Sequence, residues 1–301
     1  MRSPLVTPRR VAAALTTGSY ASAWALVRGL PEPVARHLFE AGAEVGAARG
    51  GRGIERLEAN LARVAPGRDL LRPAVRSYAR YWCEVFRLPA TPLERIVDRT
   101  DVVREHLFRD AVAASTGTVI ALPHMGNWDA AGAWCAGTGV PFTTVAERLQ
   151  PESLFDQFVS FRESLGMEVL PLTGGERPPF EILTERLQAG GTLCLMGDRD
   201  LTPRGVDVDF FGATARMPAG PARLALATGA ALLPATLSFT RDGWEIAFHP
   251  YVEHSDVATM TQQVADAFAG GIREQPQDWH MLQRVWLDDL DPDDPRRQPV
   301  G

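Results

Sequence analysis

TVIALPHMGNWD, the stretch from Thr118 to Asp129, joins a short apolar run to the expected start of a helix through a turn. The β-branched residues at 118–122 are typical of a buried strand, and Gly126 permits a tight turn. His124 and Asp129 follow the strand, five residues apart. A histidine becomes an effective general base when a carboxylate fixes its tautomer, so this spacing suggests that Asp129 orients His124. For an isolated pattern of this kind, an unrelated loop histidine beside a helix aspartate is the alternative reading.

The composition is typical of a globular protein with a sizeable core. The chain has 301 residues, of which 45% are apolar, and a formal net charge of −6. This length suits one large α/β domain or two small ones, and the negative charge gives no reason to expect a nucleic-acid partner. Every basic residue is an arginine, which excludes a lysine nucleophile or Schiff base. The three cysteines are widely spaced and read as reduced thiols, and no histidine cluster suggests a metal site.

From Thr118 onward, segments with strand-like and helix-like patterns alternate along the chain. Strands are predicted at 118–122, 142–146, 168–172, 192–196 and 232–239, with helices between them at 127–136, 153–165, 179–189 and 218–228. This alternation predicts an α/β fold with a mainly parallel central sheet flanked by helices. Asp242-Gly243 is expected to turn a hairpin into a strand at 244–248, followed by a helix at 256–273. Residues 53–110 show helical periodicity, which predicts an N-terminal helical region.

The two ends of the chain differ from this pattern. Residues 1–30 are predicted to form an interfacial membrane helix, because Tyr20, Trp24 and flanking arginines suit a bilayer surface while the apolar run is too short to span it. A secretory signal peptide and a helix packed on its own domain are the alternatives. Residues 31–290 are predicted to form a single α/β domain, and the proline-containing tail at 291–301 is predicted to be disordered.

Polar residues follow three of the predicted strands. His124 follows the first, Glu147 follows the second, and Asp198 and Arg199 follow the fourth. In a parallel sheet, ligands bind beyond the carboxyl ends of the strands, so this clustering predicts a functional site at that edge. Helix capping and surface ion pairing are the alternative roles for each carboxylate.

Arg162 lies four residues after Phe158 and eight after Leu154, on one stripe of a predicted helix. This position suggests that Arg162 binds a phosphate or carboxylate group at the rim of an apolar cavity. The alternative is that its aliphatic stem only covers apolar surface, which would produce the same spacing. Several residues are candidates for lining such a cavity or for ordinary core packing: Phe155, Phe158, Phe161, Met167, Ala219, Ala222 and Ala225.

These blocks together resemble a known family. His124 to Asp129 resembles the His-x4-Asp motif of the lysophospholipid acyltransferase superfamily. Trp128 and four later blocks are similar to the branch of the late acyltransferases of lipid A: GDRD at 197–200, VDFFG at 208–212, MPAGP at 217–221 and GAALLP at 229–234. Within that branch, DRDL at 198–201 and WHMLQ at 279–283 look most like the actinobacterial phosphatidylinositol mannoside acyltransferases.

The resemblance implies a membrane-associated O-acyltransferase. Such an enzyme moves a long-chain fatty acyl group, such as palmitoyl, from acyl-CoA to a mannose hydroxyl of a phosphatidylinositol mannoside. It would act peripherally at the cytoplasmic face of the plasma membrane, with acyl-CoA as a substrate and no further cofactor. The glycolipid acceptor and the membrane surface are the other expected partners.

The resemblance also implies roles for individual residues. His124 matches the general base, Asp129 its orienting partner, and Asp198 a further acidic catalytic residue. Arg162 and Arg204 match positions that contact acyl-CoA, and we assign Glu147 and Arg199 to substrate binding as well.

No Gly-x-Ser-x-Gly motif is present, so a serine-bound acyl intermediate has no support in the sequence. The acceptor and the donor are open at this point. Another glycolipid, a lysophospholipid acceptor or an acyl carrier protein as donor would fit the same residues. A lipid-binding relative that has lost activity is the alternative from a different functional class.

Overall fold

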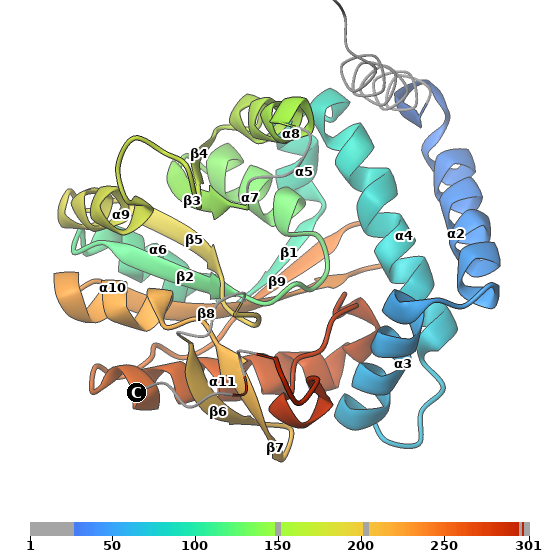
Figure 1. Ribbon diagram of the computed structural model, residues 1–301. Helices are drawn as coiled ribbons and strands as arrows, with labels where there is room; N and C mark the ends of the chain where they lie inside the picture. Colours follow the sequence, from blue (N-terminus) through green and yellow to red (C-terminus); the bar gives the residue numbers. More distant parts are fainter. Residues whose placement is uncertain (1–26, 148–151, 201–204, 295–296, 298–301) are drawn as a thin grey trace, which may run out of the picture.

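The computed structural model describes residues 27–147, 152–200, 205–294 and 297 (Figure 1). A seven-stranded sheet with the order β1-β9-β8-β2-β5-β3-β4 forms its centre, and helices cover both faces. Five neighbouring strands, from β8 to β4, are parallel, whereas β9 is antiparallel to β8. The predicted α/β fold with a mainly parallel sheet and an N-terminal helical region is therefore confirmed.

The strands of the central sheet are β1 Thr100–Val103, β2 Thr118–Leu122, β3 Phe142–Ala146, β4 Met167–Pro171, β5 Thr192–Met196, β8 Ala231–Phe239 and β9 Trp244–Phe248. A separate hairpin consists of β6 Val206–Phe210 and β7 Ala213–Met217. The helices are α2 Glu32–Ala48, α3 Arg52–Val64, α4 Leu71–Arg87, α5 Leu93–Asp98, α6 Glu105–Ala113, α7 Trp128–Gly137, α8 Glu152–Ser164, α9 Pro179–Gln188, α10 Gly220–Thr228 and α11 Val257–Glu274. Three short 3₁₀ helices are η1 Leu88–Ala90, η2 Pro276–Asp278 and η3 Leu287–Asp289.

Two features of this fold were not predicted. Strand β1 lies in the region that was read as helical, because its four residues are too few to show a period of two. It pairs in parallel with β9 at the edge of the sheet. The β6–β7 hairpin was also missed as a secondary structure, although its motif was noticed for the family resemblance.

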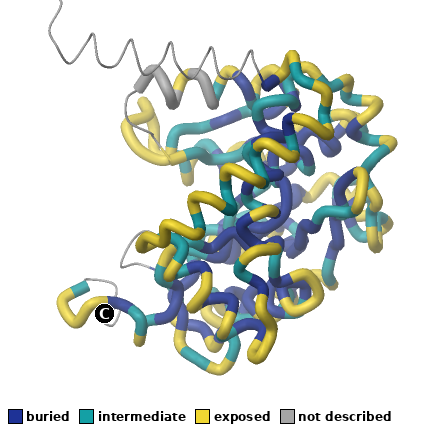
Figure 2. The backbone as a smooth tube through the Cα atoms, turned by 90° about the vertical axis from the view of Figure 1, so that its right-hand side faces the viewer, coloured by how far each residue is buried: buried dark blue, intermediate teal, exposed yellow. Residues whose placement is uncertain are grey.

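The central strand β2 separates two hydrophobic clusters, because successive side chains of a strand point to opposite faces. Val119 and Ala121 pack in a cluster with residues of α3, α9, α10 and α11, whereas Ile120 and Leu122 pack in a cluster with residues of α4, α6, α7 and α8. The buried segments of the sheet lie inside a shell of helices whose outward turns are exposed (Figure 2).

The predictions for the chain ends are largely outside the described residues. Most of the expected interfacial segment, residues 1–26, and much of the expected disordered tail fall there, so both stay predictions, as do the domain limits of 31 and 290. Among the helices of the described residues, none is long and apolar enough to cross a membrane.

Candidate active site

His124 lies beside Asp198, not beside Asp129. The Nδ1 atom of His124 is 2.6 Å from Oδ1 of Asp198. The reason is the strand register: β2 and β5 are parallel neighbours in which Leu122 faces Met196, so the residues two positions beyond each strand also meet. Gly197 donates its N–H to the carbonyl of Leu122 at 2.7 Å and extends the ladder toward this pair.

The Asp198 carboxylate is fully buried and accepts three N–H groups. Besides the ring of His124, the backbone N–H of His124 donates to Oδ2 at 2.9 Å, and the indole N–H of Trp279 donates to the same oxygen at 3.0 Å. Burial alone would raise the pKa of Asp198, but the charge of His124 and these hydrogen bonds outweigh it and lower the pKa. Asp198 is therefore ionised at neutral pH.

An ionised Asp198 determines which nitrogen of His124 carries the proton. The carboxylate is an acceptor only, so Nδ1 of the histidine must donate to it. In the neutral ring, this leaves the lone pair of Nε2 to take up a proton from a substrate. The side chain of His124 is 25% exposed, whereas Asp198 is 0% exposed. The pair thus has the arrangement of a general base held by a buried carboxylate.

Asp129 belongs to a different network, which corrects the expectation that it orients His124. It lies in the first turn of α7 and is almost fully buried. Its Oδ1 accepts the Nε–H of Arg162 at 2.7 Å, and its Oδ2 accepts the hydroxyl of Tyr81 at 3.0 Å. Asp129 therefore links α7 to α8 and α4, because the helix directs its side chain toward those helices.

Arg162 balances this buried charge. Burial would lower the pKa of Arg162, but the charge of Asp129 and the hydrogen bond to it raise the pKa well above its usual value. The pKa of Tyr81 is also raised well above its usual value, first by burial and then by the charge of Asp129. Arg162 therefore stays charged at neutral pH, and Tyr81 stays neutral.

A C-terminal segment holds the loop that carries His124. The carbonyl of His124 accepts the N–H of His280 at 2.8 Å, and Gly126 donates to the carbonyl of Asp278 at 2.8 Å. Gly126 has φ +57°, and a Cβ at this position would lie 2.8 Å from a carbonyl carbon of β8. A side chain is therefore excluded both by conformation and by space.

The side chains of Asp278 and His280, in this C-terminal segment, contact Ser77 of α4. Ser77 of α4 donates its hydroxyl to Asp278 at 2.6 Å, and its oxygen lies 2.9 Å from Nε2 of His280. Burial lowers the pKa of His280 to about 3, with a smaller contribution from the charge of His124. His280 is therefore neutral at physiological pH and is packed among aromatic rings, including those of Tyr78 and Trp128.

An apolar cavity lies between α7 and the sheet. Side chains from β2, β3, β5, β8 and β9 line it, and its charged lining residues are Asp129 and Arg162. Trp128 also lines the cavity, and its ring centroid is 5.6 Å from that of His124. The cavity therefore begins one side chain away from the candidate base.

The residues named as candidates for cavity lining or core packing divide between these two roles. Met167 lines the cavity and is also part of a hydrophobic cluster. Ala222 and Ala225 lie in the cluster on the opposite face of the sheet, and Phe161 is core. The side chains of Phe155 and Phe158 are outside the described residues.

The remaining candidates lie at the same edge of the sheet or outside the described residues. Arg199 follows β5, and its guanidinium is 3.7 Å from the carboxylate of Glu147, which follows β3. The Nε atom of Arg199 is buried and has no hydrogen-bond partner within the described part of the chain. Arg204 lies outside the described residues, so its predicted contact with the donor stays a prediction.

Comparison with known proteins identifies the family. Residues 8–288 match the bacterial lipid A biosynthesis acyltransferases. The chain belongs to this family. It is also 52% identical over 297 residues to the phosphatidylinositol mannoside acyltransferase of Mycolicibacterium smegmatis, covering 95% of this chain and 96% of that protein. Identity to the phosphatidylinositol mannoside acyltransferase of Mycobacterium tuberculosis is 51% over 286 residues, or 91% and 90% of the two chains. The resemblance inferred from the motifs is confirmed, and the protein is an acyltransferase.

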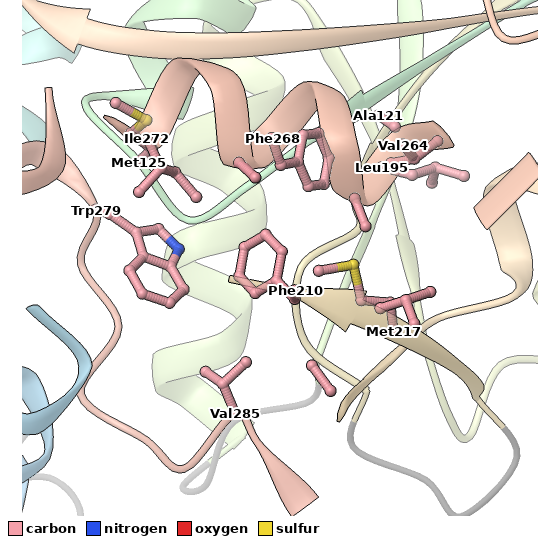
Figure 3. Close-up of a cluster of buried hydrophobic side chains, with 14 of the residues drawn as sticks. Ala121, Met125, Leu195, Phe210, Met217, Val264, Phe268, Ile272, Trp279 and Val285 are labelled. Carbon is pink, nitrogen blue, oxygen red and sulfur yellow. The ribbon is translucent and has the colours of Figure 1, made fainter. Parts of the chain in front are cut away.

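Spacing along the chain did not reveal two residues that pair with the aspartates of this candidate site. Trp279 is 81 residues from Asp198, and Tyr81 is 48 residues from Asp129. Trp279 was noticed only as part of the block at 279–283, which carried no role. Figure 3 shows Trp279 beside Met125 and Phe210 in the hydrophobic cluster, so it has the appearance of an ordinary core residue.

We predict that Trp279→Phe changes the pH dependence of the acyltransferase. The variant keeps an aromatic ring but removes one donor from the Asp198 carboxylate. A carboxylate with fewer donors holds the shared proton with His124 more tightly, so the acidic limb of kcat/KM should move to higher pH by about one unit. A pH–rate profile measures this shift.

Trp286→Phe is the matched control. Trp286 is also fully buried, its ring is 6.1 Å from that of Trp279, and its indole N–H donates to the carbonyl of Phe210 at 2.6 Å. Both variants lose one buried hydrogen bond, but only Trp279 touches Asp198. Equal pH profiles for the two variants would show that Trp279 serves packing alone.

Proposed function

We propose that this acyltransferase moves a palmitoyl or similar long-chain group from acyl-CoA to a mannose hydroxyl of a phosphatidylinositol mannoside. The pairing of His124 with the buried Asp198 beside an apolar cavity carries this proposal. The acceptor is inferred from the relatives, which share about half of their residues with this chain over nearly its whole length.

The reaction follows from the arrangement of the pair. Nε2 of His124 takes the proton of the mannose hydroxyl while the hydroxyl oxygen attacks the thioester carbonyl. Asp198 stabilises the positive charge that develops on the imidazole. When the carbon–sulfur bond breaks, the leaving thiolate takes the proton from His124. The products are an ester and free coenzyme A, and no acyl-enzyme intermediate is required.

The apolar cavity is proposed to hold the acyl chain. Its lining consists mostly of aliphatic and aromatic side chains of α7 and the sheet, which would exclude water from an alkyl chain. Gly132 of α7 contributes no side chain to it, and a Cβ there would lie 2.6 Å from the methyl group of Met167. A chain entering past Trp128 would have its thioester next to His124. Arg199 and Glu147, at the same edge, are proposed to contact the polar parts of the substrates.

A direct assay tests the proposed function. The purified protein is incubated with radiolabelled palmitoyl-CoA and a phosphatidylinositol mannoside, and the labelled product is identified by mass spectrometry. We expect one palmitoyl ester on a mannose. Transfer to a different glycolipid, or activity only with an acyl carrier protein as donor, would contradict the proposed substrates while leaving the family assignment intact.

We further propose that the enzyme works peripherally at the cytoplasmic face of the plasma membrane. The outward face of α2 supports a lipid contact. Val34, Leu38 and Val45 are 46%, 56% and 52% exposed and lie along one side of this helix. The acidic residues of the helix, Glu32, Glu40 and Glu44, are only partly exposed. An apolar helix face without carboxylates suits the boundary between lipid headgroups and acyl chains.

We predict that Leu38→Glu weakens binding to vesicles that contain anionic lipid, because a carboxylate in the interface is repelled and costly to desolvate. Co-sedimentation with vesicles measures the effect. Leu226→Glu on α10 is the control, since Leu226 is a leucine of 37% exposure on a different helix. Equal sedimentation of the two variants would argue against α2 as the lipid-facing element.

A further inference from the structure

A second cavity, separate from the site of His124, lies between α2, α4 and α5. Its most prominent feature is a set of arginines from these helices and the residues next to them: Arg28, Arg36, Arg87, Arg95 and Arg99. Two glutamates, Glu32 and Glu84, also line it. The cavity has a volume of ≈150 Å³, which is about ten times the space that one water requires. It can therefore hold a small polar group.

The two carboxylates do not balance the arginines. Glu32 is shared between Arg99, at 3.2 Å, and Arg95, at 3.3 Å. Glu84 is already paired with Arg80, whose Nε donates to it at 2.7 Å and which does not line the cavity. The cavity consequently has an excess of positive charge, and a bound anion would relieve the repulsion between its guanidinium groups.

Two of these arginines, Arg36 and Arg95, are also held loosely enough to turn toward a ligand. Among the described residues, the contacts of Arg36 are long, at 3.4 Å to the carbonyl of Arg241, 3.5 Å to Glu84 and 3.9 Å to Glu32. Arg95 is 58% exposed and pairs with Glu32 at 3.3 Å. A guanidinium fork binds oxyanions through pairs of hydrogen bonds, so several forks around one cavity suit an anion with oxygens in several directions.

We propose that this arginine pocket binds a phosphate group. A tetrahedral phosphate offers oxygens to several guanidinium groups at once, whereas a planar carboxylate is satisfied by a single fork. The phosphate can belong to a phospholipid headgroup or to a free phosphate ion, and both present the same oxygens. The inference does not depend on the proposed acyl acceptor, because none of the described residues that line the pocket contacts His124 or Asp198.

The first experiment uses inorganic phosphate as the probe. The thermal unfolding midpoint of the full-length protein is followed as phosphate replaces chloride at constant ionic strength, since a ligand that binds the folded state raises the midpoint. We expect a saturable rise for the wild type. The double variant Arg36→Gln/Arg95→Gln should bind phosphate at least about tenfold more weakly, because it loses two charge-assisted contacts.

The matched control is Arg72→Gln/Arg76→Gln. These two arginines of α4 pair with Glu44 of α2, outside the pocket, and are 68% and 44% exposed. The control therefore removes the same charge from the same region of the molecule. If the pocket and control variants respond to phosphate equally, phosphate acts on the surface in general and the proposal is overturned.

The second experiment identifies the source of the phosphate. Vesicles of phosphatidylcholine, with and without phosphatidylglycerol, are sedimented with each protein. A larger loss of binding for the pocket variant than for the control, together with competition by free phosphate, indicates a lipid headgroup. Equal sedimentation with a pocket-specific response to phosphate indicates the free ion. The absence of a pocket-specific difference in both experiments rejects the site, whatever the outcome of the palmitoyl transfer assay.

Discussion

Replacing His124 by alanine is expected to lower acyl transfer by about 10²–10⁴-fold while the protein stays folded, because the reaction loses its general base. The side chain of His124 is 25% exposed, so its removal should leave the core intact. The rate of transfer from palmitoyl-CoA and the circular dichroism spectrum, measured on one preparation, test both parts. An alanine variant with activity near that of the wild type would rule out His124 as the base.

Variants of Asp198 and Asp129 test which aspartate is the partner of His124. The structure places Asp198 beside His124, whereas the sequence suggested Asp129. Asp198→Asn should also reduce the rate severely, since an amide can accept the ring N–H but cannot stabilise the positive charge. Asp129→Asn should act mainly on stability, because Asp129 bonds to Arg162 and Tyr81. His254→Ala, which removes a histidine that lies away from the site and bonds to the carbonyl of Ala230, is the control for loss of an imidazole. If Asp129→Asn rather than Asp198→Asn removed activity without loss of stability, the assignment of the dyad would be wrong.

Arg162→Ala is expected to reduce the free energy of unfolding by about 3–5 kcal/mol, because it leaves the Asp129 carboxylate buried without its positive partner. Equilibrium unfolding in urea measures this loss. Arg186→Ala is the control: Arg186 makes a comparable pair with Glu168, at 2.6 Å, but is 49% exposed. Exposed ion pairs contribute at most about 1 kcal/mol, so this variant should be close to the wild type.

The double variant Asp129→Asn/Arg162→Ala tests the cause of the loss. Without a charge on residue 129, the removal of the arginine should cost much less, so the double variant should be more stable than Arg162→Ala alone. The same double variant tests whether Arg162 also contacts acyl-CoA, as the family resemblance implied. A raised KM for acyl-CoA in this variant would support that role, and an unchanged KM would leave Arg162 a structural partner of Asp129. A double variant as unstable as the single one would contradict the ion-pair explanation.

Local patterns in the sequence determined much of this architecture. Strands β2, β3, β5 and β9 have the predicted limits, because their apolar runs and bounding turns are encoded within a few residues. The alternation of strands and helices then implied parallel pairing, which places the carboxyl ends of the strands at one edge. This pattern alone predicts that His124, Glu147 and Asp198 lie at the same edge of the sheet.

The tertiary structure decided which of these residues meet. The choice between Asp129 and Asp198 as the partner of His124 depends on which strands lie next to β2. One of its two neighbours is β5, and the residue that β5 brings to His124 is Asp198, 74 residues further along the chain. The strand order depends on how helices from the whole chain pack against both faces of the sheet. The local periodicity of the sequence therefore does not reveal it. The spacing of His124 and Asp129 is local and was visible, but the first turn of α7 points Asp129 toward Tyr81 and Arg162. A short sequence separation brings two residues near each other, whereas the direction of each side chain depends on the elements that pack around it.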